Sequence, residues 1–166
     1  MNAIDEPERF AFIDFEASSL SSGSFPCEVG TGTLHREEPK IRSASWLIRP
    51  LAKWLRVSSA WDPKSETLTA ITREMLEEHG VAARDVVERL LAVIGERSLF
   101  SDEPSFDQHW LRQLFEAAGV GGEPPKLDDA TRSEHSLRLN APLRSWSRRN
   151  IGRSPMLDGS LSCTRA

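Results

Sequence analysis

Short apolar stretches alternate with polar turns over the first third of the chain. Residues 10–16 combine aromatic and β-branched side chains and run into a serine-rich turn, a pattern typical of a buried strand. Two more strands are predicted over residues 27–34 and 44–48, separated by a charged turn at residues 35–40. Their closeness in sequence favours an antiparallel meander. Residues 58–69, rich in Ser, Asp and Pro, are predicted to form a loop.

Helical spacing of apolar residues begins after this loop. It predicts helices over residues 71–79 and 83–94, each ended by a glycine. After a short strand at residues 98–101, Ser105 is the expected N-cap of a helix that ends at Ala118, with Phe106 and Trp110 among its inward-facing residues. A weak strand and a polar helix should follow, at residues 126–127 and 129–139. Strands first, then alternating helices and strands, predict an α/β fold with helices packed on a mixed sheet.

Composition indicates a single domain in a reducing environment. The 166 residues are enough to enclose one core, and the two cysteines, Cys27 and Cys163, are far apart and outside any metal-ligand spacing. Residues 1–10 carry three acidic residues and no apolar stretch, which argues against a signal peptide. No apolar run reaches membrane-spanning length. We therefore expect a cytoplasmic protein that does not enter a membrane.

The charge distribution divides the chain in two. The net charge is −4, yet residues 143–166 contain five arginines and one acidic residue, so residues 1–142 form an acidic body. The segment after residue 142 is rich in Ser, Arg and Gly, and its apolar residues follow neither helical nor strand spacing. We interpret residues 1–142 as the folded domain and residues 143–166 as a disordered basic tail.

Three carboxylates carry the candidate chemistry. Asp14 and Glu16 are two residues apart on a predicted strand, so both side chains leave the same face and can offer oxygen ligands to Mg²⁺ or Mn²⁺. Asp107 lies in the first turn of the helix that follows a short strand, where it can extend toward the same ion. The alternatives are two solvated acids at a strand end and an acid that stabilises a helix N-terminus. We expect the neighbouring Asp102 and Glu103 to end the strand rather than to bind metal.

Two motifs extend this pattern to a known family. Phe-Ile-Asp-Phe-Glu-Ala-Ser-Ser-Leu, residues 12–20, resembles the first motif of the DEDD (DnaQ-like, RNase T-like) exonuclease superfamily. Ser-Asp-x-Pro-x-Phe-Asp-x-x-Trp-Leu, residues 101–111, resembles the second motif of a bacterial branch. The resemblance covers about residues 10–130. One departure is Leu68-Thr69-Ala70, where the branch usually has Ile-His-Gly, so the histidine that the resemblance implies as a possible substrate contact does not stand at this position.

The resemblance implies a fold and a reaction. The fold is RNase H-like, with three antiparallel N-terminal strands, parallel strands added to them, and flanking helices. The activity is 3′→5′ exonuclease cleavage of single-stranded DNA or RNA, with two Mg²⁺ or Mn²⁺ ions about 4 Å apart. Asp14, Glu16 and Asp107 take three of the four acidic positions, and Glu16 lies close to the substrate's 3′-hydroxyl. The oligomeric state is left open, a homodimer included.

The family's third motif supplies a general-base histidine and the fourth acid, and residues 126–166 do not contain it. His135 is followed five residues later by Asn140, where an acid is needed. A shifted reading of the codons for residues 149–158 permits His-Arg-Ala-x-x-Asp-Ala-Arg, which matches the motif. We therefore hypothesise a frameshift between about Pro142 and Arg149. The competing reading is a catalytically impaired RNase H-like module that binds nucleic-acid ends or a protein partner.

Overall fold

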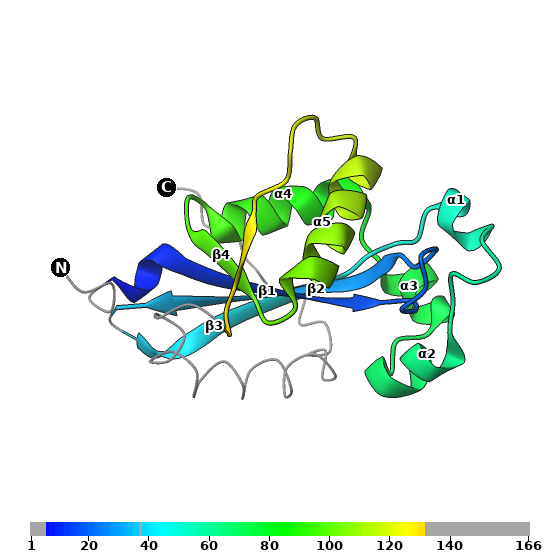
Figure 1. Cartoon of the computed structure of the whole chain (residues 1–166), viewed down its shortest axis with the longest axis horizontal. Helices are drawn as coiled ribbons and strands as arrows, with labels where there is room; N and C mark the ends of the chain where they lie inside the picture. The colour runs from blue at the N-terminus through cyan, green and yellow to red at the C-terminus, as the bar shows by residue number, and fades with distance from the viewer. Residues whose placement is uncertain (1–5, 37, 132–166) are drawn as a thin grey trace.

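A five-stranded sheet forms the centre of the protein (Figure 1). The structure is a computed structural model that describes residues 6–36 and 38–131. The strand order is β3-β2-β1-β4-β5. The strands are β1 (Phe10–Ala17), β2 (Pro26–His35), β3 (Glu38–Leu47), β4 (Ser98–Ser101) and β5 (Leu127–Asp129).

The pairing of the strands is mixed, as the sequence predicts. β1, β2 and β3 pair antiparallel, whereas β4 pairs parallel to β1 and β5 parallel to β4. The mixed α/β architecture, three antiparallel strands followed by parallel additions, is therefore confirmed. β4 pairs with β1 along Phe10 to Phe12, and among the described residues no strand lies beside the second half of β1 on that side. That unpaired stretch contains Asp14 and Glu16.

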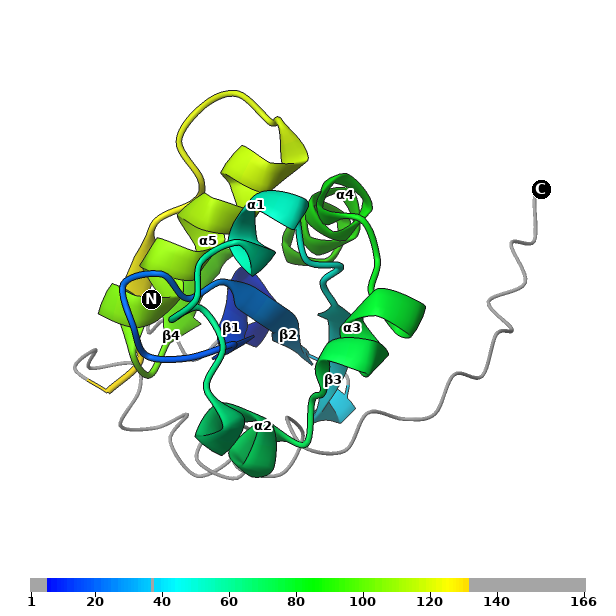
Figure 2. The same cartoon turned by 90° about the vertical axis from the view of Figure 1, so that its right-hand side faces the viewer.

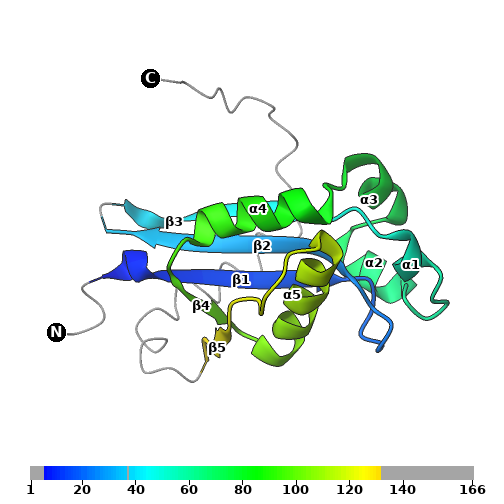
Figure 3. The same ribbon diagram turned by 90° about the horizontal axis from the view of Figure 1, so that it is seen from above.

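Two helices cover one face of the sheet. α4 (Ala83–Ile94) and α5 (Pro104–Ala118) pack against each other and over β1 and β2, as Figures 1 and 3 show. Alternate residues of β1, namely Ala11, Ile13 and Phe15, face these helices and are buried in the main core. The core side chains contributed by the two helices are Val86, Val87, Leu90, Ile94, Trp110, Leu111, Leu114 and Phe115.

Three short helices gather at the end of the sheet where β1 ends (Figures 2 and 3). They are α1 (Ala52–Leu55), α2 (Pro63–Thr69) and α3 (Arg73–His79). The prediction of a loop throughout residues 58–69 is wrong, because α2 occupies its second half. The Asp62 side chain accepts a hydrogen bond from the Lys64 N–H at 2.9 Å, and Pro63 provides the first helical residue. α1 was not predicted, since four residues are too few to show a period.

Two other predicted boundaries are wrong. β3 begins at Glu38 rather than at residue 44, because antiparallel pairing with β2 continues to His35 opposite Glu38 and shortens the predicted charged turn. The polar helix does not start at Asp129, which is the last residue of β5. The Thr131 N–H and hydroxyl both donate to the Asp129 carboxylate, an arrangement that favours a turn there.

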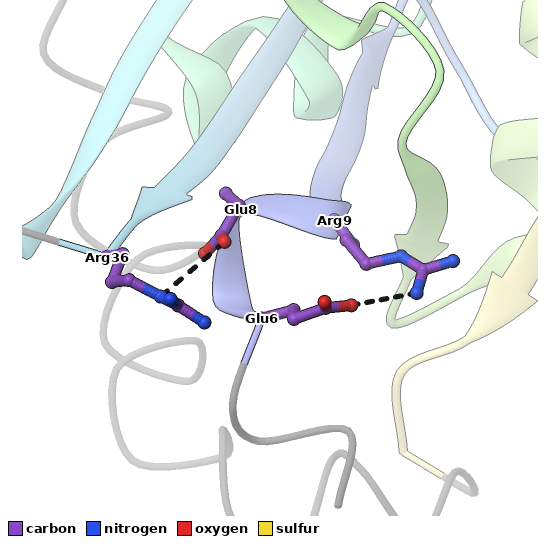
Figure 4. Close-up of polar contacts among 4 residues, drawn as sticks. All are labelled: Glu6, Glu8, Arg9 and Arg36. Atoms are coloured by element: carbon purple, nitrogen blue, oxygen red, sulfur yellow. Dashed lines mark hydrogen bonds and ion pairs between the residues drawn. The ribbon is translucent and has the colours of Figure 1, made fainter. Parts of the chain in front are cut away.

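An N-terminal turn is fixed to the sheet by charged side chains. The 3₁₀ turn η2 (Pro7–Arg9) precedes β1, and Glu8 forms an ion pair of 3.6 Å with Arg36, just beyond the end of β2 (Figure 4). Glu6 and Arg9 form a second, exposed ion pair of 2.8 Å. Exposed pairs of this kind contribute about 0–1 kcal/mol each, so the turn orients the start of β1 more than it stabilises the fold.

Some predictions fall outside the described residues. These are the rest of the polar helix up to residue 139, the domain boundary at residue 142 and the basic tail at residues 143–166. Among the residues that are described, no helix combines the length and apolar character needed to span a membrane.

Candidate metal centre

Asp14 and Glu16 lie on the face of β1 that is turned away from α4 and α5. The alternation along the strand puts them on the side of Phe12, whose ring contacts that of Phe100 on β4 at a centroid distance of 6.0 Å. Asp14 and Glu16 are each partly buried. The predicted strand and the shared face of the two acids are both present.

Asp107 is brought to the same end of β1 by the first turn of α5. Its side chain is only 2% exposed, and it accepts hydrogen bonds from the Ser101 hydroxyl and from the backbone N–H of Phe15. The Phe15 N–H also donates to Asp14, so one backbone group of β1 lies between the two carboxylates. The structure therefore brings Asp14 and Asp107 together, as the sequence predicts.

α5 is held in place by contacts with the loop between β1 and β2. The Trp110 indole N–H donates to the Ser24 hydroxyl at 3.2 Å, and the Gln113 amide donates to the Ser24 carbonyl at 3.0 Å. On the other side of the helix, Gln108 bonds the Leu127 N–H at the start of β5 at 2.8 Å. Because the helix is anchored at both sides, the Asp107 carboxylate has a fixed position relative to β1.

Asp102 also reaches this end of the sheet. Asp14, Asp102 and Asp107 each offer one carboxylate oxygen, and these three oxygens all lie within 4.8 Å of one another. Asp102 directly follows β4, as expected, and its carboxylate lies in this group, a position that the sequence does not predict. The signal that could have identified it is the parallel register of β4 on β1, which local sequence patterns do not reveal.

Glu16 lies beside this group and has a second neighbour. It contributes to the electrostatic environment of Asp14 and is itself affected by Asp107, but it is not among the three residues whose oxygens lie within 4.8 Å. Directly opposite it on β2 is Glu28, which is 5% exposed and receives a hydrogen bond from Ser45. Two acids at facing positions repel each other unless a proton or a cation lies nearby. Glu28 was not singled out from the sequence.

Burial and mutual repulsion raise the pKa values of these acids. Burial first, and then the charges of Asp107, Asp102 and Glu16, raise the pKa of Asp14 to about 8. Burial and the charge of Glu28 raise the pKa of Glu16 to about 7. Burial raises the pKa of Asp107 to about 7, although its hydrogen bond from Ser101 lowers it. Carboxylates that are this costly to ionise fit a divalent cation, whose charge offsets the repulsion and whose preferred ligands are oxygens.

Two details near the centre differ from the predictions. Helix α5 begins at Pro104, so Glu103 and not Ser105 is the N-cap residue. Phe106 does not face inward: its side chain is 47% exposed and stacks on Trp110 at a centroid distance of 5.8 Å. The reason is the helical period, since the neighbouring Asp107 takes the buried position.

Leu68-Thr69-Ala70, where the branch that the sequence resembles usually has Ile-His-Gly, lies at the end of α2. Ala70 follows α2 with a φ of 58°, in the left-handed region that favours glycine, the residue usual at this position in the branch. Leu68 is 85% exposed. The turn that ends α2 therefore carries a cost in backbone strain at Ala70.

Comparison with known proteins finds relatives in structure only. No protein-family model matches the chain, and no curated protein sequence matches it. Exonuclease I from Methylocaldum szegediense matches with a TM-score of 0.57 at 16% identity, over 90% of this chain and 32% of that one. The zinc-bound complex of Escherichia coli exonuclease I with single-stranded DNA gives 0.56 at 13% identity, over 88% and 31%. The E. coli enzyme with a dA16 oligonucleotide gives 0.57 at 14% identity, over 94% and 34%.

The chain has the fold of exonuclease I. The RNase H-like architecture expected from the two sequence motifs is thereby confirmed. The chain spans about a third of the length of the exonuclease I proteins that it matches. In this exonuclease I fold, the residues of both motifs meet at one end of β1, where Asp14 and Asp107 lie together.

Proposed function

We propose that the protein is a divalent-metal-dependent 3′→5′ exonuclease that hydrolyses phosphodiester bonds of single-stranded nucleic acid. The observation that carries the proposal is the meeting of Asp14 and Asp107 at the end of β1, within a fold shared with exonuclease I. The buried position of Asp107 supports the proposal. A carboxylate that is only 2% exposed is costly to ionise unless a cation or a strong hydrogen-bond donor lies beside it.

In this proposal the chain's own side chains bind the metal ions and its hydrogen-bond donors orient the carboxylate ligands. Asp14 and Asp107 offer oxygen ligands. Glu16 adds another carboxylate farther along β1, opposite the buried Glu28. Mg²⁺ or Mn²⁺, two ions in a complete site, would activate water and stabilise the leaving 3′-oxygen. The Ser101 hydroxyl donates a hydrogen bond that holds the Asp107 carboxylate, and the Phe15 N–H orients both aspartates. These donors fix the carboxylates before an ion arrives, which lowers the cost of ordering them.

The proposed substrate class is supported by the neighbours in structure. E. coli exonuclease I forms complexes with single-stranded DNA and with a dA16 oligonucleotide. For the present chain we propose single-stranded nucleic acid as the substrate, degraded from its 3′ end. DNA is the substrate to test first, with RNA of the same sequence beside it.

The polarity of cleavage tests the proposal directly. A single-stranded oligonucleotide with a dye on its 5′ end should yield a ladder of progressively shorter dye-carrying products when Mg²⁺ or Mn²⁺ is added. With EDTA present the full-length band should persist. Immediate release of a dye-labelled mononucleotide would mean cleavage from the 5′ end and would contradict the proposal. A single dye-carrying product of fixed intermediate length would mean one internal cut, with the same consequence.

A second function is favoured by the residues around the three aspartates. Within residues 6–36 and 38–131 the group contains no histidine; His109 contacts Gln113 and His35 contacts Thr33. Loss of a general base alone costs about 10²–10⁴-fold in rate. If the oligonucleotide is retained but never shortened, the protein is a binding module for nucleic-acid ends. Fluorescence anisotropy of the same labelled oligonucleotide measures that binding.

A further inference from the structure

We propose that Asp102 is a third ligand residue of the cation site formed by Asp14 and Asp107. This inference rests on the metal site of the proposed function and adds a carboxylate that, from the sequence alone, is expected to end a strand rather than to bind metal. Its basis is the group of three carboxylate oxygens that all lie within 4.8 Å of one another. That spacing suits oxygens that surround one hard cation at about 2.0–2.6 Å each.

The strand register accounts for the position of Asp102. In the parallel pairing of β1 with β4, Phe10 lies opposite Ser98 and Phe12 opposite Phe100. Two residues beyond the last of these pairs are Asp14 on β1 and Asp102, the first residue after β4, and one carboxylate oxygen of each lies within 4.8 Å of the other. The parallel pairing of β4 with β1 therefore delivers Asp102, directly after β4, to the part of β1 that holds Asp14.

The backbone around Asp102 is held on both sides. Ser101 is 3% exposed, its hydroxyl donates to Asp107, and it accepts the Glu103 N–H at 3.0 Å. Pro104 then begins α5. Because the flanking residues are tied to each other and to Asp107, Asp102 has little freedom to move its backbone away from the group. Its side chain is exposed, so it can approach an ion from the solvent side while the buried Asp107 approaches from the interior.

A third carboxylate changes what the site can hold. Two aspartates leave a divalent cation with its charge just balanced, whereas three give a net negative site with stronger attraction for the ion. Asp14 and Asp107 also experience the Asp102 charge directly, since it is among the groups that raise the pKa of both. A cation among the three removes that repulsion. The three-carboxylate group lies wholly within residues 14–107.

Binding of Mn²⁺, measured by electron paramagnetic resonance of the free ion and by calorimetry, tests the inference without any activity. Wild type should be compared with Asp102→Asn, Asp14→Asn and the matched control Glu103→Gln. Glu103 is the adjacent exposed acid and is not in the group, so it reports on general surface charge. We expect Asp102→Asn to weaken binding by about tenfold or more, the size seen when supporting groups of metal sites are removed. Glu103→Gln should change it by less than about threefold.

The outcomes separate this inference from the proposed function. If Asp14→Asn weakens Mn²⁺ binding but Asp102→Asn binds as wild type does, Asp102 is not a ligand and the metal site of the proposed function stands. If wild type itself does not bind Mn²⁺, both fail. Equal weakening by Asp102→Asn and Glu103→Gln would assign the effect to surface charge and overturn the inference. Thermal melts in EDTA check that each variant is folded, and Asp102→Glu, which restores the carboxylate, should recover part of the affinity.

Discussion

Replacing Asp14 by asparagine should slow hydrolysis of a single-stranded oligonucleotide by about 100-fold or more under single-turnover conditions. The amide keeps the shape of the side chain but removes the negative charge that attracts the cation. A bound metal ion contributes several kcal/mol of transition-state stabilisation, and each 1.36 kcal/mol is about tenfold in rate. Asp14 is one of the three acids whose oxygens meet at the end of β1, so its loss should remove much of that contribution.

The matched control for this substitution is Glu116→Gln on the same protein. Glu116 is an exposed acid near the far end of α5 and makes no side-chain contact with the three aspartates. Its rate should equal that of wild type within about twofold. Equal rates for wild type and Asp14→Asn, with both dependent on added metal, would place the metal site elsewhere and refute the assignment of Asp14.

The metal-free protein should lose thermal stability as the pH rises from about 5 to about 9. The ordinary pKa values are 3.8 for Asp and 4.5 for Glu, whereas Asp14 is raised to about 8 and Glu16 and Asp107 to about 7. An acid whose pKa is higher in the folded state binds its proton more tightly there. Its stabilising effect is complete below the unfolded pKa, near 4, and is lost as the pH passes through the folded values of about 7 to 8.

Melting temperatures in EDTA across this pH range check the prediction, and two comparisons sharpen it. Asp14→Asn cannot ionise at that position, so at alkaline pH it should melt above wild type, by about 2–4 °C for each kcal/mol of relieved repulsion. Mn²⁺ should raise the melting temperature of wild type more at alkaline than at acidic pH, because the ion competes with protons for the same oxygens. A melting temperature that rises steadily with pH in EDTA would contradict the raised pKa values.

The sequence predicted what depends on local pattern. The β1 strand, helix α4 and strand β4 occur where apolar spacing places them, and two short motifs predict that Asp14 and Asp107 meet. The closeness of Asp102 to Asp14 and Asp107 is not predictable in this way, because it depends on which strand pairs with which and in what register. That pairing joins residues 88 positions apart, Phe12 and Phe100, and no local pattern encodes it.

The remaining misses have similar causes. Helix α2 is not predicted because Asp62 and Pro63 are also common in turns. They mark the start of a helix only when the residues after them form a helical turn. Glu28 appeared to be an ordinary strand residue, and only the antiparallel register shows that it faces Glu16. Phe106 was expected inward because it is aromatic, but the helical period gives the buried position to Asp107.

The most direct test of the account is where Mn²⁺ binds. Trace Mn²⁺ added to ¹⁵N-labelled protein broadens amide resonances close to the ion in a two-dimensional NMR spectrum. The account predicts that the Phe15 amide, which donates to both Asp14 and Asp107, broadens first, together with amides at the end of β4. The amide of Gly119, at the far end of α5 and about 18 Å along the helix from Asp107, should remain sharp. Broadening centred away from β1, or equal broadening of Phe15 and Gly119, would contradict a cation site at these carboxylates.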